Sequence, residues 1–340
     1  MFKISILYDK IYLINGGNNM INVAIVGLGY ISKRAALGVK YSNKANLYMA
    51  VSRNINKAKE FAKELEIDNV GTFNDMLNDK NIDLVYLCTS NNVHYEQIKD
   101  CLNNKKHVIC EKPMVSSSKE IKELFSLAKL NNVFLMEAEK TLFNLVNQSI
   151  KEVIKSGIIG EVNTIVADYS YAIDNMNYDS NHWVFSKDNG GVLLDIGVYP
   201  LCFALLHTNS SIKNITSYCM YDNTNTYDKY ANAIIEFDNN IIANITTSWL
   251  YQSPNRGTGY IYGTKGYIHA PAFWKNNYFE VITDNNVDKI IVDQKSEFSG
   301  QIDHACQMIR ENKYESDYYN EDMHLVLNGI ITEIKNNKGN

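Results

Sequence analysis

No apolar run in this 340-residue chain approaches the roughly 20 residues that a helix needs to cross a bilayer. Positive charge is not in excess either, because 33 Lys and Arg stand against 38 Asp and Glu, which gives a formal net charge of -5. Nucleic-acid binding relies on clustered Lys and Arg that release counterions. These absences argue against a membrane protein and against a nucleic-acid partner.

The cysteines form no CxxC pair and follow no regular spacing; they are Cys88, Cys101, Cys110, Cys202, Cys219 and Cys306. Scattered thiols of this kind suit a reducing compartment better than a disulfide framework. His304 and Cys306 are two residues apart, but no second ligand pair lies nearby, as a tetrahedral zinc site would need. We therefore expect a cytoplasmic protein without a metal centre.

The N-terminal stretch lacks the features of a targeting segment. Its short apolar run is interrupted at Asp9 and Lys10, and no small-residue cleavage site follows. The first convincing strand begins just after Met20. Residues 1–19 are therefore interpreted as an N-terminal extension outside the fold, neither signal peptide nor membrane anchor.

What the chain does contain is enough apolar material for a large core, with 45% hydrophobic and 21% charged residues. Its length exceeds the size at which a single core usually stops growing, so two domains are expected. In the first half, short apolar strands alternate with helical stretches, a pattern typical of a doubly wound parallel sheet of the Rossmann type. The expected strands are Ile21–Val26, Asn46–Val51, Ile82–Cys88, Val108–Cys110 and Val133–Met136, and the clearest helices are a stretch from about Ser32, Ile55–Leu65 and Ser117–Leu130.

After about residue 160, runs rich in β-branched and aromatic residues are separated by turn signals, which predicts a large, mainly antiparallel sheet. The expected strands are Val162–Tyr171, Ile215–Met220, Ala231–Phe237, Ile241–Leu250, Gly259–Tyr262 and Tyr278–Ile282. Two helices, Gln301–Arg310 and Asn320–Lys335, are expected to close the chain. The predicted domains are residues 20–140, a nucleotide-binding Rossmann domain, and residues 141–340, an α+β domain for substrate binding and oligomerisation.

A glycine turn follows the first strand directly, in the order Gly27-Leu-Gly29-Tyr30-Ile31-Ser32. Gly27 permits the tight turn, Gly29 lets the backbone approach a pyrophosphate at a helix N-terminus, and Ser32 replaces the third glycine of the usual pattern. A plain strand-to-helix turn is the alternative. Because strand, glycines and helix are in register, dinucleotide binding is favoured.

The residues after the second strand, Ser52 and Arg53, indicate which dinucleotide is bound. An acidic side chain there would accept the ribose hydroxyls of NAD, whereas a basic one accommodates the 2′-phosphate of NADP. NADP is therefore favoured over NAD, with a solvated surface arginine as the alternative.

Two further segments carry chemistry. Glu111 and Lys112 directly follow a short strand, where ligands of open α/β sheets bind. Asp195 and Tyr199 are four residues apart, so they share a face if the segment is helical. Taken singly, Lys112 could be a surface lysine, Asp195 a helix cap and Tyr199 a core aromatic.

Together these motifs resemble the glucose-fructose oxidoreductase and inositol dehydrogenase family (Gfo/Idh/MocA). The resemblance runs from about Ile21 to Lys335 and rests on the separated signatures GLGYIS, SRNINKAKEFA, EKP, SGIIGEV and GGVLLDIGVYP. The GTKG turn and the pair Phe273-Trp274 resemble the dihydrodiol dehydrogenase branch.

This resemblance implies a Rossmann domain followed by an open-faced antiparallel sheet, with the active site between them and the sheet used to form a homodimer or homotetramer. It places Lys112 near the reacting carbon and makes Asp195 a catalytic residue that either hydrogen-bonds the substrate or orients Lys112. Tyr199 is the acid/base candidate, where many sugar dehydrogenases have histidine. It also places the loop Thr89 to His94 beside the cofactor. The expected cofactor-binding residues are Gly27, Gly29, Tyr30, Ile31, Ser52, Arg53, Thr89, Asn91, His94, Glu111 and Lys112.

The reaction so implied is reversible hydride transfer between nicotinamide and the secondary alcohol or carbonyl carbon of a sugar, polyol or diol. An alcohol releases hydride only as its proton is removed, so a base must lie within reach, and a nearby cation would lower the pKa of the Tyr199 phenol. A sensor or structural protein that binds NAD(P) without turnover is one alternative, and NAD(P)-assisted elimination or hydrolysis is another.

The substrate pocket is predicted less directly. His182, Trp183 and Trp274 are expected to contact substrate, although tryptophan in a sheet is as often a core or interface residue. The segment Asn181 to Phe185 lacks the arginine that the family often has after the tryptophan, which leaves the substrate open.

Overall fold

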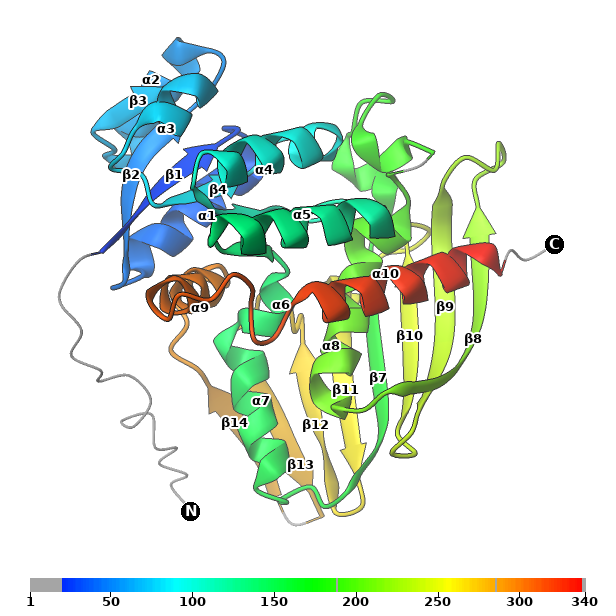
Figure 1. Ribbon diagram of the computed structural model, residues 1–340. Coiled ribbons are helices and arrows are strands. Elements are labelled where there is room, and N and C mark those ends of the chain that lie inside the picture. Colours follow the sequence, from blue (N-terminus) through cyan, green and yellow to red (C-terminus); the bar gives the residue numbers. More distant parts are fainter. Residues whose placement is uncertain (1–19, 188, 285, 338–340) are drawn as a thin grey trace.

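The structure is a computed structural model that describes residues 20–187, 189–284 and 286–337. The expected N-terminal extension, residues 1–19, lies outside the described residues. Two sheets dominate the described chain, and Figure 1 shows the first above and the second below and to the right.

The first sheet has six parallel strands in the order β3-β2-β1-β4-β5-β6. Its strands are β1 (Ile21–Val26), β2 (Ala45–Val51), β3 (Asn69–Gly71), β4 (Leu84–Leu87), β5 (His107–Cys110) and β6 (Leu135–Glu137). The connecting helices are α1 (Tyr30–Tyr41), α2 (Ile55–Leu65), α3 (Phe73–Asn78), α4 (His94–Asn103) and α5 (Ser118–Asn131). Every residue of β4 is buried, as expected where helices cover both faces of a parallel sheet. This is the predicted doubly wound Rossmann architecture.

The second sheet has eight strands in the order β14-β13-β12-β11-β7-β10-β9-β8. All neighbours are antiparallel except β7 and β10, which pair in parallel. Its strands are β7 (Val162–Ser170), β8 (Ile212–Tyr221), β9 (Asp228–Phe237), β10 (Ile242–Ser248), β11 (Gly257–Gly263), β12 (Gly266–Pro271), β13 (Tyr278–Thr283) and β14 (Asn286–Ile291). The predicted fold class, a Rossmann sheet followed by a mainly antiparallel sheet, is confirmed.

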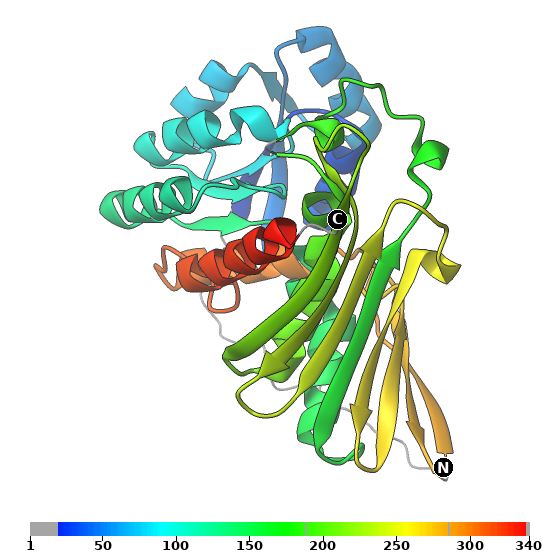
Figure 2. The ribbon, with the colours of Figure 1, turned by 90° about the vertical axis from the view of Figure 1, so that its right-hand side faces the viewer.

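Helices cover one face of the second sheet and leave the other open. The helices α6 (Lys140–Phe143), α7 (Leu145–Lys155) and α8 (Val198–Thr208) lie on the side that faces the first sheet, and Figure 2 shows the strands in front of them. The strands alternate accordingly: in β11, Gly259 and Ile261 are buried, whereas Tyr260 and Tyr262 are only half-buried. The sheet is therefore open-faced, as the sequence resemblance implied.

The two closing helices return to the first sheet. α9 (Ser299–Arg310) packs on α1, where a Cβ on Gly38 would lie 2.6 Å from the Cβ of Phe298. α10 (Glu321–Asn336) lies along α5 and against β8 (Figure 1). Because the C-terminal helices pack on the helices of the first sheet, the division into residues 20–140 and 141–340 remains a prediction.

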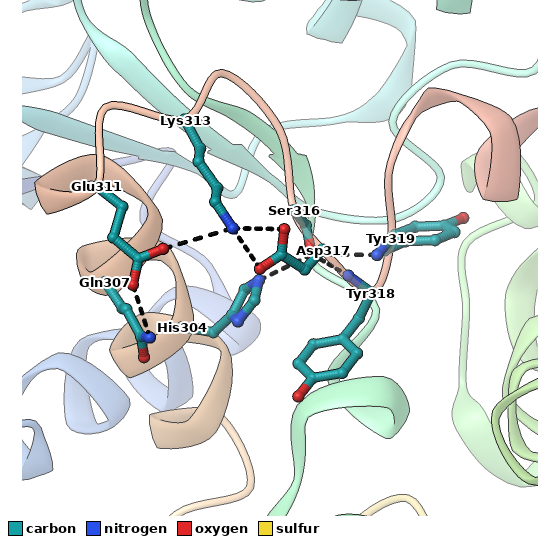
Figure 3. Close-up of polar contacts among 8 residues, drawn as sticks. All are labelled: His304, Gln307, Glu311, Lys313, Ser316, Asp317, Tyr318 and Tyr319. Carbon is teal, nitrogen blue, oxygen red and sulfur yellow. Dashed lines mark hydrogen bonds and ion pairs between the residues drawn. The ribbon is translucent and has the colours of Figure 1, made fainter. Parts of the chain in front are cut away.

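Polar contacts brace the connection between α9 and α10 (Figure 3). His304 Nε2 lies 2.8 Å from Ser316 Oγ, and Lys313 pairs with both Glu311 and Asp317. His304 is thus part of the structural support of this turn. Among the described residues, no group of three or more His, Cys, Asp or Glu is arranged to hold a metal ion, and no helix is long and apolar enough to span a membrane.

Candidate active site

The glycine turn after β1 has the geometry that a pyrophosphate requires. Gly27 has a φ of +85°, and a Cβ there would lie 2.7 Å from Thr89 Cγ2. A Cβ on Gly29 would meet no heavy atom within 4 Å, so the space above the first turn of α1 is open. That turn contains no acidic residue, and no side chain caps it. Its free N–H groups therefore suit an anion such as the dinucleotide pyrophosphate.

The adjacent cofactor candidates lie at the surface. Tyr30, at the start of α1, is 77% exposed, and Ile31 is half-buried. After β2, Arg53 is exposed and Ser52 Oγ accepts a hydrogen bond of 3.1 Å from the Asn54 N–H. No carboxylate occupies this turn, so the charge of Arg53 is available to a 2′-phosphate.

The loop after β4 is fastened to its neighbours. His94 is buried, and its two ring nitrogens each lie 3.0 Å from a backbone oxygen, those of Pro113 and Thr89. Both ring nitrogens are thus engaged by the protein, which fits a role in positioning the loop, and the expected contact of His94 with the cofactor remains a prediction. Thr89 Oγ1 donates to Gln97, and Asn91 Nδ2 donates to the backbone oxygen of Asn189 at 3.2 Å. The loop thereby joins the two halves of the chain.

Lys112 and Asp195 meet where the two sheets face each other. Lys112 Nζ donates to the backbone oxygen of Asp195 and lies 3.8 Å from its Oδ1. The other carboxylate oxygen accepts hydrogen bonds from the Tyr171 hydroxyl at 2.5 Å and from Trp249 Nε1 at 3.3 Å. Asp195 is 8% exposed. Its position is therefore set by contacts from both β7 and the end of β10.

The segment that contains Asp195 and Tyr199 is helical, but its first turn is not α-helical. Leu193–Gly197 forms a π-helical turn, and Tyr199 lies on α8 just after it. π-turns of this kind often accompany functional sites. The two residues still converge on one cation, since Lys112 Nζ lies 5.0 Å from the centre of the Tyr199 ring.

Lys140 is the residue that the sequence reasoning missed. Its Nζ donates to the Tyr199 hydroxyl at 3.2 Å and lies 4.4 Å from the ring centre, and only 6% of Lys140 is exposed. A pattern that could have identified Lys140 is present in the sequence. Glu139-Lys140 is a charged pair that comes just after an apolar strand, in the same way as Glu111-Lys112. Both pairs follow neighbouring parallel strands, so they reach the same edge of the first sheet.

Burial shifts the pKa values of both Lys140 and Tyr199. Desolvation, together with the charge of Arg34, lowers the pKa of Lys140 to about 7. Burial also raises the pKa of the Tyr199 phenol well above its usual value, and the carboxylates of Glu139 and Glu111 add to the increase. The sequence-based expectation was a lowered phenol pKa, but in the protein alone the surrounding carboxylates and burial outweigh the two lysines.

Two carboxylates border the lysine pair. Glu111 Oε1 accepts from the Tyr86 hydroxyl at 2.8 Å, and burial raises the pKa of Glu111. Glu139 is fully buried, its Oε2 has no hydrogen-bond partner among the described residues, and burial raises its pKa to about 7. Lys140, Glu139 and Tyr199 therefore form a buried group in which the charge on one residue shifts the pKa of the others.

The three substrate candidates occupy two places. His182 stacks on Tyr178, with ring centres 4.1 Å apart, and Trp183 is half-buried beside it. Trp274 is 3% exposed and stacks on Tyr169 at 3.8 Å, and the Tyr169 ring centre lies 5.4 Å from that of Tyr199. Trp274 thus supports the wall of the site from behind Tyr169, and contact of these three residues with substrate remains a prediction.

Sequence comparisons match both halves of the chain. Residues 21–139 match the family described as "Oxidoreductase family, NAD-binding Rossmann fold", and residues 147–269 match the "GFO/IDH/MocA C-terminal domain". The trans-1,2-dihydrobenzene-1,2-diol dehydrogenase of Xenopus laevis is 31% identical over 223 residues, which cover 65% of this chain and 66% of that enzyme. The Mus musculus enzyme of the same name is 26% identical over 235 residues, 68% of each chain. The chain thus spans about two thirds of the length of these relatives.

Solved structures share the whole architecture. The aldose-aldose oxidoreductase of Caulobacter crescentus has a TM-score of 0.82 at 21% identity, over 94% of this chain and 97% of that one. A 3-ketoreductase of Actinomadura kijaniata, solved with NADP and TDP-benzene, has a TM-score of 0.79 at 19% identity, over 94% and 98% of the chains. At this level of identity the likeness establishes the fold.

Proposed function

Since this chain belongs to the Gfo/Idh/MocA family of NAD(P)-binding oxidoreductases, we propose that it transfers a hydride reversibly between nicotinamide and the CH–OH or carbonyl carbon of a sugar, polyol or diol. The observation that carries the proposal is the meeting of Lys112, Tyr199 and Lys140 at the edge of the first sheet where the glycine turn also lies. A fold alone has no need of two lysines around one phenol.

Proton transfer in this proposal is the work of Tyr199 and Lys140. The bound nicotinamide supplies or takes up the hydride. In the reducing direction the Tyr199 hydroxyl gives its proton to the substrate oxygen, and the Lys140 ammonium gives a proton to the phenolate oxygen that remains. In the oxidising direction both protons move the other way, so Tyr199 accepts the alcohol proton as Lys140 accepts that of Tyr199.

Lys112 and Asp195 form an ion pair beside the Tyr199 ring. The Asp195 carboxylate, itself fixed by Tyr171 and Trp249, keeps the Lys112 ammonium beside the Tyr199 ring. We assign to Lys112 the stabilisation of negative charge on the substrate oxygen, and to Asp195 the orientation of Lys112. The functions of the named relatives support alcohols and carbonyls of diols and sugars as the substrate class.

The experiment that tests the proposed function is a substrate screen with purified protein. Nicotinamide absorbance is followed with sugars, polyols and diols in the presence of NADP, and with the corresponding carbonyl compounds in the presence of NADPH. The account expects a change with at least one member of the panel. NADPH binding without turnover on the whole panel would favour a cofactor-binding sensor instead.

We expect the protein to prefer NADP over NAD, because Arg53 offers a guanidinium, and no carboxylate, where the ribose lies. Arg53→Asp should reverse the preference. Fluorescence titration with NADPH and NADH measures both dissociation constants. Lys63→Asp, an exposed position on α2, is the control for the change in charge. Tighter NADH binding by the unchanged protein would overturn this assignment.

The open face of the second sheet is proposed as the homo-oligomer interface. Half-buried aromatic rings cluster there, with Tyr260 stacked on His269 at 4.6 Å and Tyr262 lying 5.6 Å from Tyr267. Such a patch is typical of an interface. Tyr262→Glu should convert the dimer or tetramer to monomers in light scattering, whereas Lys63→Glu should leave the assembly intact. A mass equal to one chain for the unchanged protein would refute the interface.

A cytoplasmic location is the remaining part of the proposal. All six cysteines are free, and five of them are buried. Thiols that are kept reduced suit a reducing compartment.

A further inference from the structure

A cavity of about 400 Å³ lies at the end of the second sheet where β7 and β10 finish. Three segments line it: the loop before β11, with Gln252, Asn255 and Arg256; the β12–β13 connection, with Ala272, Lys275 and Asn276; and Tyr278 at the start of β13. Side-chain amides and two cations therefore make up most of its wall. None of these residues has a role in the proposed proton transfer.

The cations of this cavity lack acidic partners. Among residues 20–187, 189–284 and 286–337, no carboxylate lies within ion-pair distance of Arg256 or Lys275. Desolvation lowers the pKa of Lys275, and the charges of Arg256 and Arg34 lower it further. In a chain with a net charge of -5, this is a local concentration of positive charge.

The backbone of the cavity is held in an unusual conformation. Asn255, Arg256 and Ala272 have φ values of 54°, 66° and 45°, in the left-handed region that arginine and alanine seldom adopt. A hydrogen bond of 3.0 Å from the Ala272 N–H to the Gly257 oxygen ties the two loops together. Left-handed residues outside helix ends cluster at ligand sites, where the surrounding structure compensates for the strain.

Two tyrosines lie between Arg256 and residues of the candidate active site. The Arg256 guanidinium carbon lies 5.5 Å from the centre of the Tyr171 ring, whose hydroxyl donates to Asp195. Arg256 also hydrogen-bonds Tyr169, whose ring contacts that of Tyr199. Arg256 therefore joins the wall of the cavity to two tyrosines that contact residues of the candidate active site.

We propose that Arg256 and Lys275 form a substrate subsite for an anionic group, so that the natural substrate is a hydroxylated compound that carries a carboxylate or a phosphate. Guanidinium and ammonium groups bind both kinds of oxyanion. The side-chain amides of Gln252 and Asn276 each donate one N–H to a backbone oxygen and have a second N–H to offer. This inference rests on the proposed function, since it names the class of substrate that the same site turns over.

The test compares neutral and anionic sugars in a complex that does not react. Glucose, glucuronate and glucose 6-phosphate, each as its methyl glycoside so that no free carbonyl can accept a hydride, are titrated calorimetrically into protein saturated with NADPH, in which no oxidised cofactor is present to take a hydride from an alcohol. We expect at least one of the two anions to bind roughly 10- to 100-fold more tightly than glucose, as charge-assisted hydrogen bonds predict, and to lose the advantage in high salt. The better of the two identifies the oxyanion.

Matched variants locate the effect. Arg256→Gln and Lys275→Gln should each remove most of the advantage of the anion, whereas Lys265→Gln, which removes one charge at the opposite end of the β11–β12 pair, should keep it. Equal binding of glucose and both anions, or an advantage that survives in the two subsite variants, overturns the proposal. If NADPH fails to bind, the proposed function fails, and the same titration on the free protein still reports on the subsite.

Discussion

Tyr199→Phe should reduce turnover by roughly 10²- to 10⁴-fold, the usual effect of losing a positioned acid/base group. The substitution removes one hydroxyl and keeps the ring between Lys112, Lys140 and Tyr169. NADPH affinity should hardly change, because the glycine turn and Arg53 lie on other elements. Steady-state rates on the best substrate are compared with fluorescence titration of NADPH.

Two outcomes would count against this assignment. Near-normal turnover in Tyr199→Phe would remove Tyr199 from the chemistry. A parallel loss of rate and NADPH affinity would mean that the phenol builds the site without transferring a proton. Tyr314→Phe is the matched control, since this half-buried tyrosine lies on the connection between α9 and α10 and its ring contacts Lys129 of α5.

Lys140→Met should abolish the inflection of kcat/KM near neutral pH. It should also lower the rate roughly 10- to 100-fold, as loss of a charge-assisted hydrogen bond predicts. Burial lowers the pKa of Lys140 to about 7, so the side chain is charged below that pH and neutral above it. Carbonyl reduction needs the charged form, and its kcat/KM should fall as pH rises through about 7. Alcohol oxidation needs the neutral form, and its kcat/KM should rise over the same range.

Further variants assign the titrating group. Charged and titratable groups around Lys140 are Glu111, Lys112, Glu139, Tyr199 and Arg34. The negative charge of Glu139 raises the pKa of Lys140. The Glu139→Gln variant should therefore still show the inflection of kcat/KM, but at a lower pH. Loss of the inflection in Glu139→Gln, with retention in Lys140→Met, would assign it to the carboxyl. Lys112→Met should lower the rate at every pH.

The fold was predictable wherever apolar periodicity was long and bounded by turn signals. The helix Ile55–Leu65 was predicted with its observed bounds, and β1 was predicted as Ile21–Val26. Elements that are short or of mixed pattern were not predicted. β3 has three residues, and β14 alternates exposed and half-buried positions at the edge of the sheet. Their positions depend on pairing with distant strands, which leaves little trace in local sequence.

The site was predictable where a motif named the residue. Gly27, Gly29, Lys112, Asp195 and Tyr199 lie where their motifs indicated, although Asp195 sits in a π-turn. The burial of individual side chains could not be predicted from the sequence. Whether Lys140 is a solvated lysine or a buried partner of Tyr199 depends on α8 and Phe298, which are far away in sequence. The contact between the His94 ring and the Pro113 oxygen could not be predicted for the same reason, because only the fold brings them together.

Transfer of deuterium from NADPH that carries deuterium at both C4 positions tests the central claim most directly. Labelled cofactor is incubated with protein and a panel of keto sugars and related carbonyl compounds, and the products are analysed by mass spectrometry. The account predicts deuterium on the newly formed carbinol carbon of at least one product, one atom for each NADP formed, and loss of this transfer in Tyr199→Phe. Bound NADPH that gives its deuterium to no product, with every carbonyl compound recovered unchanged, would contradict it.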